Sequence, residues 1–131
     1  MLFKDITVID ENYEAQEHFH ILVEGNKIAY VGKEMPADYT GEVYDGKNKV
    51  AMPGFFNIHS HIPMPLLRGY GEGLPLQNWL FDRMFPFEAK LTPEDCYWGA
   101  LLGQIEMIKS GVTSFTDMYM MMVGIVRAVD E

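Results

Sequence analysis

The order of the elements predicted after residue 50 constrains the fold more than any other feature of the sequence. Residues 50–58 are mostly apolar, include Pro53-Gly54 and predict a buried strand entered through a turn, and residues 112–118 predict a second strand. Between them lie a loop rich in Gly and Pro and a helix predicted over residues 92–110, and a further helix is expected from residue 123. Two strands joined through a helix of this length lie parallel in one sheet. The order therefore predicts the opening of an α/β fold.

The helix predicted over residues 92–110 has recognisable signals at both ends. Thr92 is a suitable N-cap, Pro93 suits the first helical position, and Asp95 follows the cap by three residues. Gly111 is suited to the position just past the end of a helix. The side chains at helical spacing that we expect to form the buried stripe are Tyr97, Leu101, Gln104, Ile105 and Ile108.

Residues 1–50 have a different pattern, which predicts short β-strands. Residues 18–24 alternate between apolar and polar side chains, and residues 27–31 return as the partner strand. Gly25-Asn26 between them is a two-residue hairpin signal, because both residues tolerate a positive φ. No helical period longer than one turn interrupts this segment, so we expect it to be all-β.

Length and composition exclude several classes of protein. A chain of 131 residues cannot form a complete (β/α)₈ barrel, which needs about 200 residues. A net charge of −9 argues against binding to nucleic acid or to an anionic membrane surface. The single cysteine, Cys96, cannot form an internal disulfide, and no signal peptide or membrane span is visible. We therefore expect a globular cytoplasmic protein.

The four histidines form two His-x-His pairs. Residues i and i+2 of a strand point to the same face, so two such imidazoles can reach one metal ion. His18 and His20 lie on a strand whose other face supplies the core, and we interpret them as a polar, outward-facing pair. His59 and His61 end the predicted buried strand just before the long loop, where parallel α/β folds bind ligands. They are candidate metal ligands, and hydrogen-bonded histidines at a strand end are the alternative.

A resemblance to a known family begins at this pair. The segment similar to the first barrel strand of the amidohydrolase superfamily is Pro53-Gly54-Phe55-Phe56-Asn57-Ile58-His59-Ser60-His61. Later segments resemble the branch that holds S-adenosylhomocysteine and 5′-methylthioadenosine deaminases and the triazine chlorohydrolases: Pro63-Met64, Leu66-Leu67-Arg68-Gly69, Leu74-Pro75-Leu76, Trp79-Leu80, Pro86, Glu88, Tyr97-Trp98-Gly99, Glu106-Met107-Ile108, Ser110-Gly111, Thr113 and Asp117-Met118-Tyr119. The resemblance covers essentially the whole chain.

The resemblance implies a (β/α)₈ metal-dependent hydrolase barrel preceded by strands of a small β-sandwich. Residues 1–50 would be the β-sandwich segment, and residues 51–131 the first βα units of the barrel. The barrel is incomplete in 131 residues, so we expect the N-terminal portion of a longer enzyme. The family resemblance also implies a homo-oligomer of that full-length enzyme.

The resemblance implies a site with one divalent metal, zinc or sometimes iron. His59 and His61 match its first two ligands. Glu88 matches the carboxylate that holds the ribose hydroxyls of a nucleoside, and Trp79 matches an aromatic side chain lining that pocket. From the residues alone, Trp79 is a core side chain and Glu88 a helix-end charge. The remaining ligands and the catalytic residues of the family have no counterpart among these residues.

The implied activity is hydrolytic deamination of an adenosine derivative: S-adenosylhomocysteine, 5′-methylthioadenosine or adenosine. A triazine- or guanine-type amidohydrolase or chlorohydrolase is the near alternative, and a truncated non-catalytic fragment is the other. We expect a small nucleoside-like substrate, and no turnover by the 131 residues alone. Arg68 is expected to bind an anion or to clamp its loop. Asp117 is expected to support the metal site or to be a hydrogen-bonded turn residue.

Overall fold

The computed structural model describes residues 1–131 and shows two compact units, Met1–Pro53 and Gly54–Glu131. The first unit contains the strands β1 (Leu2–Ile9), β2 (Ala15–Glu24), β3 (Lys27–Gly32), β4 (Val43–Asp45) and β5 (Val50–Ala51). The second contains β6 (Phe55–Ser60), a 3₁₀ turn (Met64–Leu67), α1 (Leu76–Asn78), a π-helical turn (Trp79–Met84), α2 (Phe85–Glu88), α3 (Pro93–Lys109), β7 (Val112–Asp117) and α4 (Met122–Val129). None of the helices combines the length and hydropathy needed to cross a membrane.

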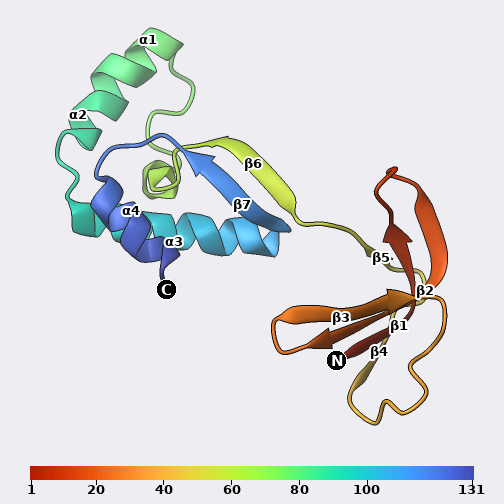
Figure 1. Ribbon diagram of the computed structural model, residues 1–131. Coiled ribbons are helices and arrows are strands. Elements are labelled where there is room, and N and C mark those ends of the chain that lie inside the picture. The colour runs from red at the N-terminus through yellow and green to blue at the C-terminus, as the bar shows by residue number, and fades with distance from the viewer. The chain divides into compact units, whose positions relative to one another are not determined.

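The first unit is one sheet with the strand order β3-β2-β1-β4, to which β5 adds through β1 (Figure 1). β2 and β3 form the predicted hairpin, in which Glu24 pairs with Lys27 and Gly25 has a φ of 58°. β1 and β2 are antiparallel, and their pairing shifts register on both sides of Ile6. The unit is a single layer, and its place in a β-sandwich stays a prediction.

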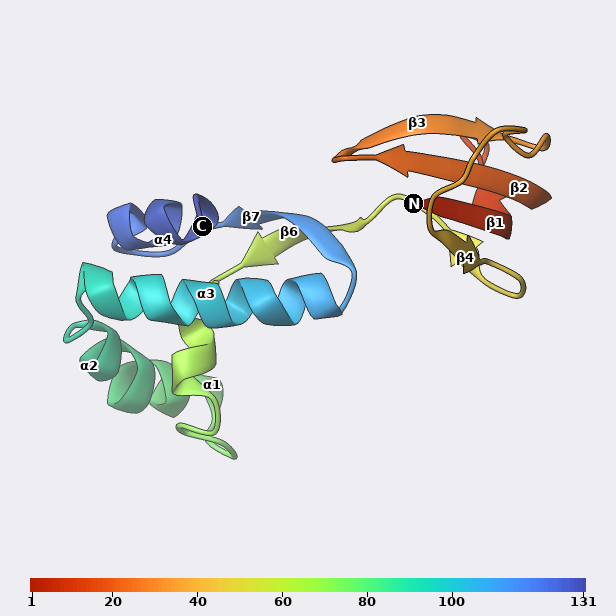
Figure 2. The ribbon, with the colours of Figure 1, turned by 90° about the horizontal axis from the view of Figure 1, so that it is seen from below.

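The second unit is built on a parallel strand pair. β6 and β7 lie side by side, with Asn57 paired to Phe115 and Ser60 to Asp117. The helix α3 lies between the two strands in sequence and runs beside them (Figure 2). The predicted parallel crossover is therefore confirmed, and it brings the carboxyl ends of both strands to one edge.

The predicted burial of the strand within residues 50–58 is wrong, and the expected turn at Pro53-Gly54 separates two strands. Val50–Ala51 pairs with β1 in the first unit and Phe55–Ser60 pairs with β7 in the second. Phe56 and Ile58 of β6 are 72% and 84% exposed. A parallel strand is buried on both faces only where helices cover both faces of its sheet, and these side chains of β6 have no such cover.

The helix α3 begins and ends where the sequence predicts, but its buried face differs. Thr92 and Asp95 form a capping box, and Gly111 follows the helix with a φ of 82°. Ile105 and Ile108 of the predicted stripe are exposed. The buried face consists instead of small side chains and one tyrosine, namely Cys96, Tyr97, Gly99, Ala100 and Gly103.

Small residues are needed on this face of α3 because backbone approaches it closely. A Cβ atom on Gly103 would lie 2.6 Å from the carbonyl oxygen of Ile62, and one on Gly99 would lie 2.7 Å from that of Pro63. The segment that follows β6 therefore rests directly on α3. Ile125 and Ala128 of α4 complete this core, which also holds Ile62.

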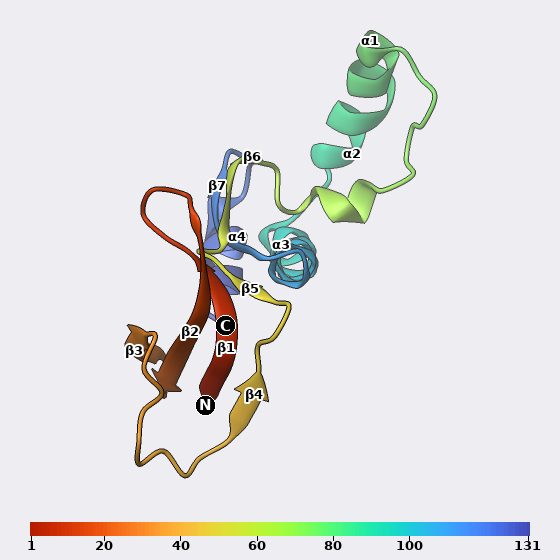
Figure 3. The same cartoon turned by 90° about the vertical axis from the view of Figure 1, so that its right-hand side faces the viewer.

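Residues 76–88 form an irregular helical run that contains Pro86. The run begins as α1, widens into the π-helical turn and ends as α2 (Figure 3, where α3 is viewed end-on). The amide of Phe85 bonds to the carbonyl oxygen of Leu80, five residues earlier. Pro86 has no amide hydrogen to donate, so it cannot continue the regular helical ladder, and the wide turn lies directly before it.

Candidate metal and substrate site

His59 and His61 lie together at the carboxyl end of β6. Their ring centroids are 5.1 Å apart and the ring planes meet at 82°. Nδ1 of His61 is 2.7 Å from the carbonyl oxygen of Met118, just past the end of β7. Because a carbonyl oxygen only accepts, Nδ1 donates in this contact, and in the neutral imidazole Nε2 then keeps a free lone pair. This is the tautomer in which an imidazole binds a metal through Nε2.

Asp117 supports the same corner from the end of β7. Its Oδ1 accepts a hydrogen bond of 2.9 Å from the amide of Ile62, the residue after His61. Ser60 Oγ donates to the carbonyl oxygen of Thr116 at 2.8 Å and lies 3.4 Å from Asp117 Oδ1. The residues on both sides of His61 are thus tied to β7, which fixes the backbone that carries the imidazole.

A cavity of about 590 Å³ opens beside His61. Most of its lining is apolar, and methionine side chains are prominent in it. The lining residues are His61, Met64, Trp79, Leu80, Met84, Phe85, Glu88, Met118, Tyr119 and Met120. A concave apolar site with a few polar groups is the usual form of a small-molecule pocket. The cavity therefore has the size and lining expected for a small organic ligand.

Glu88 enters this cavity from the end of α2 and is held by one hydrogen bond. The hydroxyl of Tyr119 donates to its Oε1 at 2.8 Å. Both side chains are half-buried, and burial is the largest cause that raises the pKa of Tyr119 above its ordinary value. The hydrogen bond to Glu88 raises the same pKa further, so the phenol is a donor at neutral pH.

The structure brings most of the predicted site residues together. His61, Trp79 and Glu88 line one cavity, although they come from the end of β6, the π-helical turn and α2. His59 lies beside His61 but is exposed and does not line the cavity. Arg68 forms an ion pair of 2.7 Å with Glu106 of α3, so it clamps its loop. Asp117 is hydrogen-bonded within the corner described above.

Sequence reasoning missed two parts of the site. One is Tyr119, whose position two residues after β7 was a signal, because polar residues at that edge face the ligand-binding end of a parallel sheet. The other is the methionine lining, in which Met118 and Met120 face the cavity. Methionine is flexible and polarisable, so such a lining adapts to apolar groups of different shape.

The donor groups of this corner fit part of a metal site. His59 and His61 offer imidazole nitrogens at strand spacing, which zinc accepts as ligands. The chain contains no group of three or more His, Cys, Asp or Glu side chains arranged to hold a metal ion. The two imidazoles therefore suit two positions of a site that needs further ligands.

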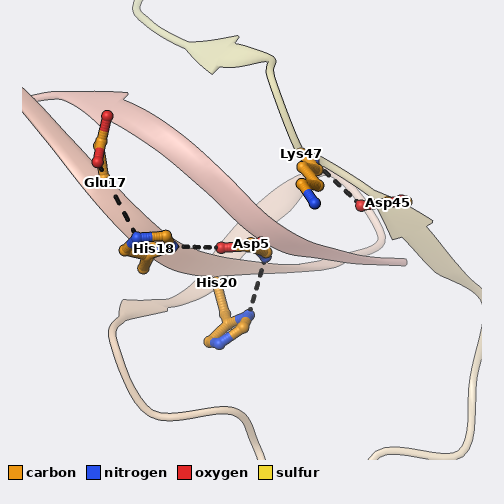
Figure 4. A network of polar contacts seen from close by, with 6 residues as sticks. All are labelled: Asp5, Glu17, His18, His20, Asp45 and Lys47. Carbon is orange, nitrogen blue, oxygen red and sulfur yellow. Dashed lines mark hydrogen bonds and ion pairs between the residues drawn. The ribbon is translucent and has the colours of Figure 1, made fainter.

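The second histidine pair is engaged in a different network (Figure 4). Nδ1 of His18 lies 2.7 Å from Oδ1 of Asp5, and the amide of Asp5 donates to Nδ1 of His20 at 3.2 Å. Asp5 and His18 both have positive φ values, 56° and 63°, where the β1–β2 register is irregular. His18 is exposed and His20 half-buried, so the outward-facing interpretation holds for His18.

A parallel strand–helix–strand unit with two histidines at the carboxyl end of its first strand fits the opening of a metal-dependent α/β-barrel hydrolase. The chain belongs to the amidohydrolase family within this class. The profile described as "Amidohydrolase family" matches residues 50–131. The predicted family and fold class are thereby confirmed.

Two curated relatives illustrate the similarity. The chain is 54% identical to a 5′-deoxyadenosine deaminase from Methanocaldococcus jannaschii over 85% of its own length and 27% of the relative's. It is 46% identical to a 5-methylthioadenosine/S-adenosylhomocysteine deaminase from Carboxydothermus hydrogenoformans over 100% of its own length and 31% of the relative's. The chain thus spans less than a third of the relatives it matches.

Solved structures agree on the fold. Atrazine chlorohydrolase TrzN from Arthrobacter aurescens, in complex with zinc, matches 98% of the chain with a TM-score of 0.81 and 22% identity, over 33% of its own length. An adenosine deaminase from Xanthomonas campestris with bound zinc matches 98% of the chain with a TM-score of 0.75 and 26% identity, over 31% of its own length.

Proposed function

We propose that these residues belong to a metal-dependent amidohydrolase that hydrolytically deaminates an adenosine derivative. The observation that carries this proposal is the cavity that His61 and Glu88 both line, at the ligand-binding edge of the parallel strands. It joins a group suited to bind a metal with a group suited to bind hydroxyls. The activities after which the two curated relatives are named support deamination of 5′-deoxyadenosine, 5′-methylthioadenosine or S-adenosylhomocysteine.

His59 and His61 would hold one divalent metal, zinc or alternatively iron. The hydrogen bond from His61 Nδ1 to the carbonyl oxygen of Met118 supports this role, because it leaves the lone pair of Nε2 to bind the metal. A bound zinc ion supplies Lewis acidity and lowers the pKa of water to about 7. The further ligands and the groups that move protons would come from parts of the enzyme outside these 131 residues.

Glu88 and Trp79 would bind the substrate. An ionised carboxylate can accept hydrogen bonds from two neighbouring hydroxyl groups, so Glu88 suits the vicinal diol of a ribose. Trp79 offers a large apolar surface to the sugar or the base. The methionines would pack on the apolar part of the ligand and keep water from it. We also propose that the enzyme is cytoplasmic and homo-oligomeric. The single cysteine, Cys96, supports a reducing compartment.

Triazine or guanine derivatives are the alternative substrates. The match to the atrazine chlorohydrolase supports the shared fold alone. Glu88 distinguishes the alternatives, because triazines and guanine lack the vicinal hydroxyls that its half-buried carboxylate is suited to bind. This feature favours a ribosyl substrate.

The test is an activity and metal assay on the enzyme expressed from the complete reading frame. We expect ammonia release from 5′-deoxyadenosine and 5′-methylthioadenosine, and about one equivalent of divalent metal by mass spectrometry. His59→Ala and His61→Ala should lose both metal and activity. The matched control replaces the other pair, His18→Ala with His20→Ala, and should keep both. Turnover of triazines or guanine without turnover of nucleosides would contradict the proposal.

A further inference from the structure

Tyr119 and Glu88 meet from two separate parts of the second unit. Glu88 ends the four-residue helix α2, and Tyr119 lies two residues beyond β7. Their contact is the 2.8 Å hydrogen bond from the phenol hydroxyl to Oε1. Both side chains line the cavity, so this bond is part of the cavity wall.

Glu88 has no other side-chain partner that could orient it. None of the four ion pairs in the structure includes Glu88. A glutamate side chain has three rotatable bonds, and fixing them in one conformation costs rotamer entropy. A carboxylate that must accept two hydroxyl protons at once therefore binds better when its orientation is fixed in advance.

The geometry leaves Glu88 with the acceptor capacity that a diol needs. The Tyr119 bond occupies one lone pair of Oε1, so Oε2 and the other lone pair of Oε1 remain free. Tyr119 itself is constrained, since it packs against the core of the second unit and its ring centroid lies 6.1 Å from that of His61.

We infer that Tyr119 is a positioning residue that holds the Glu88 carboxylate ready for the vicinal diol of the substrate. The inference rests on the proposed function, which it extends by naming the residue that sets the preference for ribosyl over deoxyribosyl substrates. It acts on binding and not on the reacting atoms, so it predicts a specific change in KM.

The experiment compares adenosine with 2′,3′-dideoxyadenosine, in the enzyme expressed from the complete reading frame. Tyr119→Phe removes the hydroxyl and keeps the ring. We expect its KM for adenosine to rise about 10- to 100-fold with kcat nearly unchanged, since a hydrogen bond to a charged group has that effect. Both parameters for 2′,3′-dideoxyadenosine should stay the same. Tyr70→Phe is the matched control, because the exposed Tyr70 does not line the cavity. This variant should leave KM and kcat unchanged for both nucleosides.

A double-mutant cycle separates positioning from a general structural effect. If Tyr119 acts through Glu88, then Tyr119→Phe combined with Glu88→Gln should raise KM for adenosine no more than Glu88→Gln alone. Three results would overturn the inference while the proposed function stands: an equal rise in KM for both nucleosides, additive effects of the two substitutions on KM, or an unchanged KM for adenosine. Absence of nucleoside deamination by the unmutated enzyme would overturn both.

Discussion

Asp117 Oδ1 accepts a hydrogen bond of 2.9 Å from the backbone amide of Ile62, which ties the end of β7 to the residue that follows His61. Ile62 is 2% exposed, so no solvent can replace this acceptor. The bond thus holds the segment between β6 and the 3₁₀ turn against the sheet. It explains how an irregular loop can present His61 in a fixed orientation.

Replacement of Asp117 should destabilise the protein. We expect Asp117→Ala to lower the free energy of unfolding by about 1–3 kcal/mol, because it leaves the buried Ile62 amide unsatisfied. Asp117→Asn keeps an oxygen acceptor and should cost less. Urea denaturation followed by circular dichroism measures both. If Asp117→Asn lowers the free energy of unfolding as much as Asp117→Ala, the hydrogen bond to the Ile62 amide is not the main contribution of Asp117 to stability.

Gly124 should not tolerate alanine. A Cβ atom there would collide with the carbonyl oxygen of Pro93 at the start of α3. Helix propensity alone predicts that Gly→Ala within a helix stabilises by about 1 kcal/mol, whereas overpacking costs about 1–3 kcal/mol. Because Pro93 contributes backbone and not a flexible side chain, we expect Gly124→Ala to be destabilising in thermal unfolding. A rise in Tm would contradict this close packing of α3 and α4.

The capping box makes part of the stability depend on pH. The hydroxyl and the amide of Thr92 donate to Asp95 at 2.6 and 2.8 Å and hold the pKa of that carboxyl below its ordinary value of 3.8. A depressed folded pKa contributes stability that is present above the unfolded pKa and is lost as the pH falls through the folded one.

The comparison with Asp95→Asn measures this contribution. We expect the unmutated protein to be more stable than the variant at pH 7, and the difference to shrink below about pH 4 as Asp95 takes up a proton. Thr92→Val removes the hydroxyl partner and should weaken the same acid dependence. Urea titrations between pH 7 and pH 3 provide the check, and a difference that is constant over this range would contradict the assignment.

Local signals in the sequence predicted those parts of the fold that depend on local geometry. The capping residues Thr92 and Asp95 and the hairpin at Gly25 specify backbone conformations within a few residues, and the structure has all of them. The buried face of α3 was mispredicted because glycine adds nothing to an apolar stripe. Gly99 and Gly103 are buried since they admit the backbone of Ile62 and Pro63, which periodicity cannot reveal.

The candidate site was predictable to the extent that motifs carry it. His61 was identified from its spacing and its place at a strand end, and Trp79 and Glu88 through the family resemblance. The structure places all three around one cavity. Tyr119 was missed because its contact with Glu88 joins residues 31 positions apart. Such a pairing depends on how α2 and β7 meet in three dimensions, for which neither segment has a local signal.

The exposed apolar side chains of β6 should make the 131-residue chain self-associate. Ile58 is 84% exposed, and the two-stranded sheet leaves an unpaired edge on β6 as well as on β7. Unpaired strand edges with apolar side chains are templates for association. We expect Ile58→Glu to lower the apparent mass at high concentration in multi-angle light scattering. Tyr13→Ser is the matched control, since Tyr13 is 90% exposed but lies outside any strand. An equal decrease from both variants would show that the β6 edge has no special part in association.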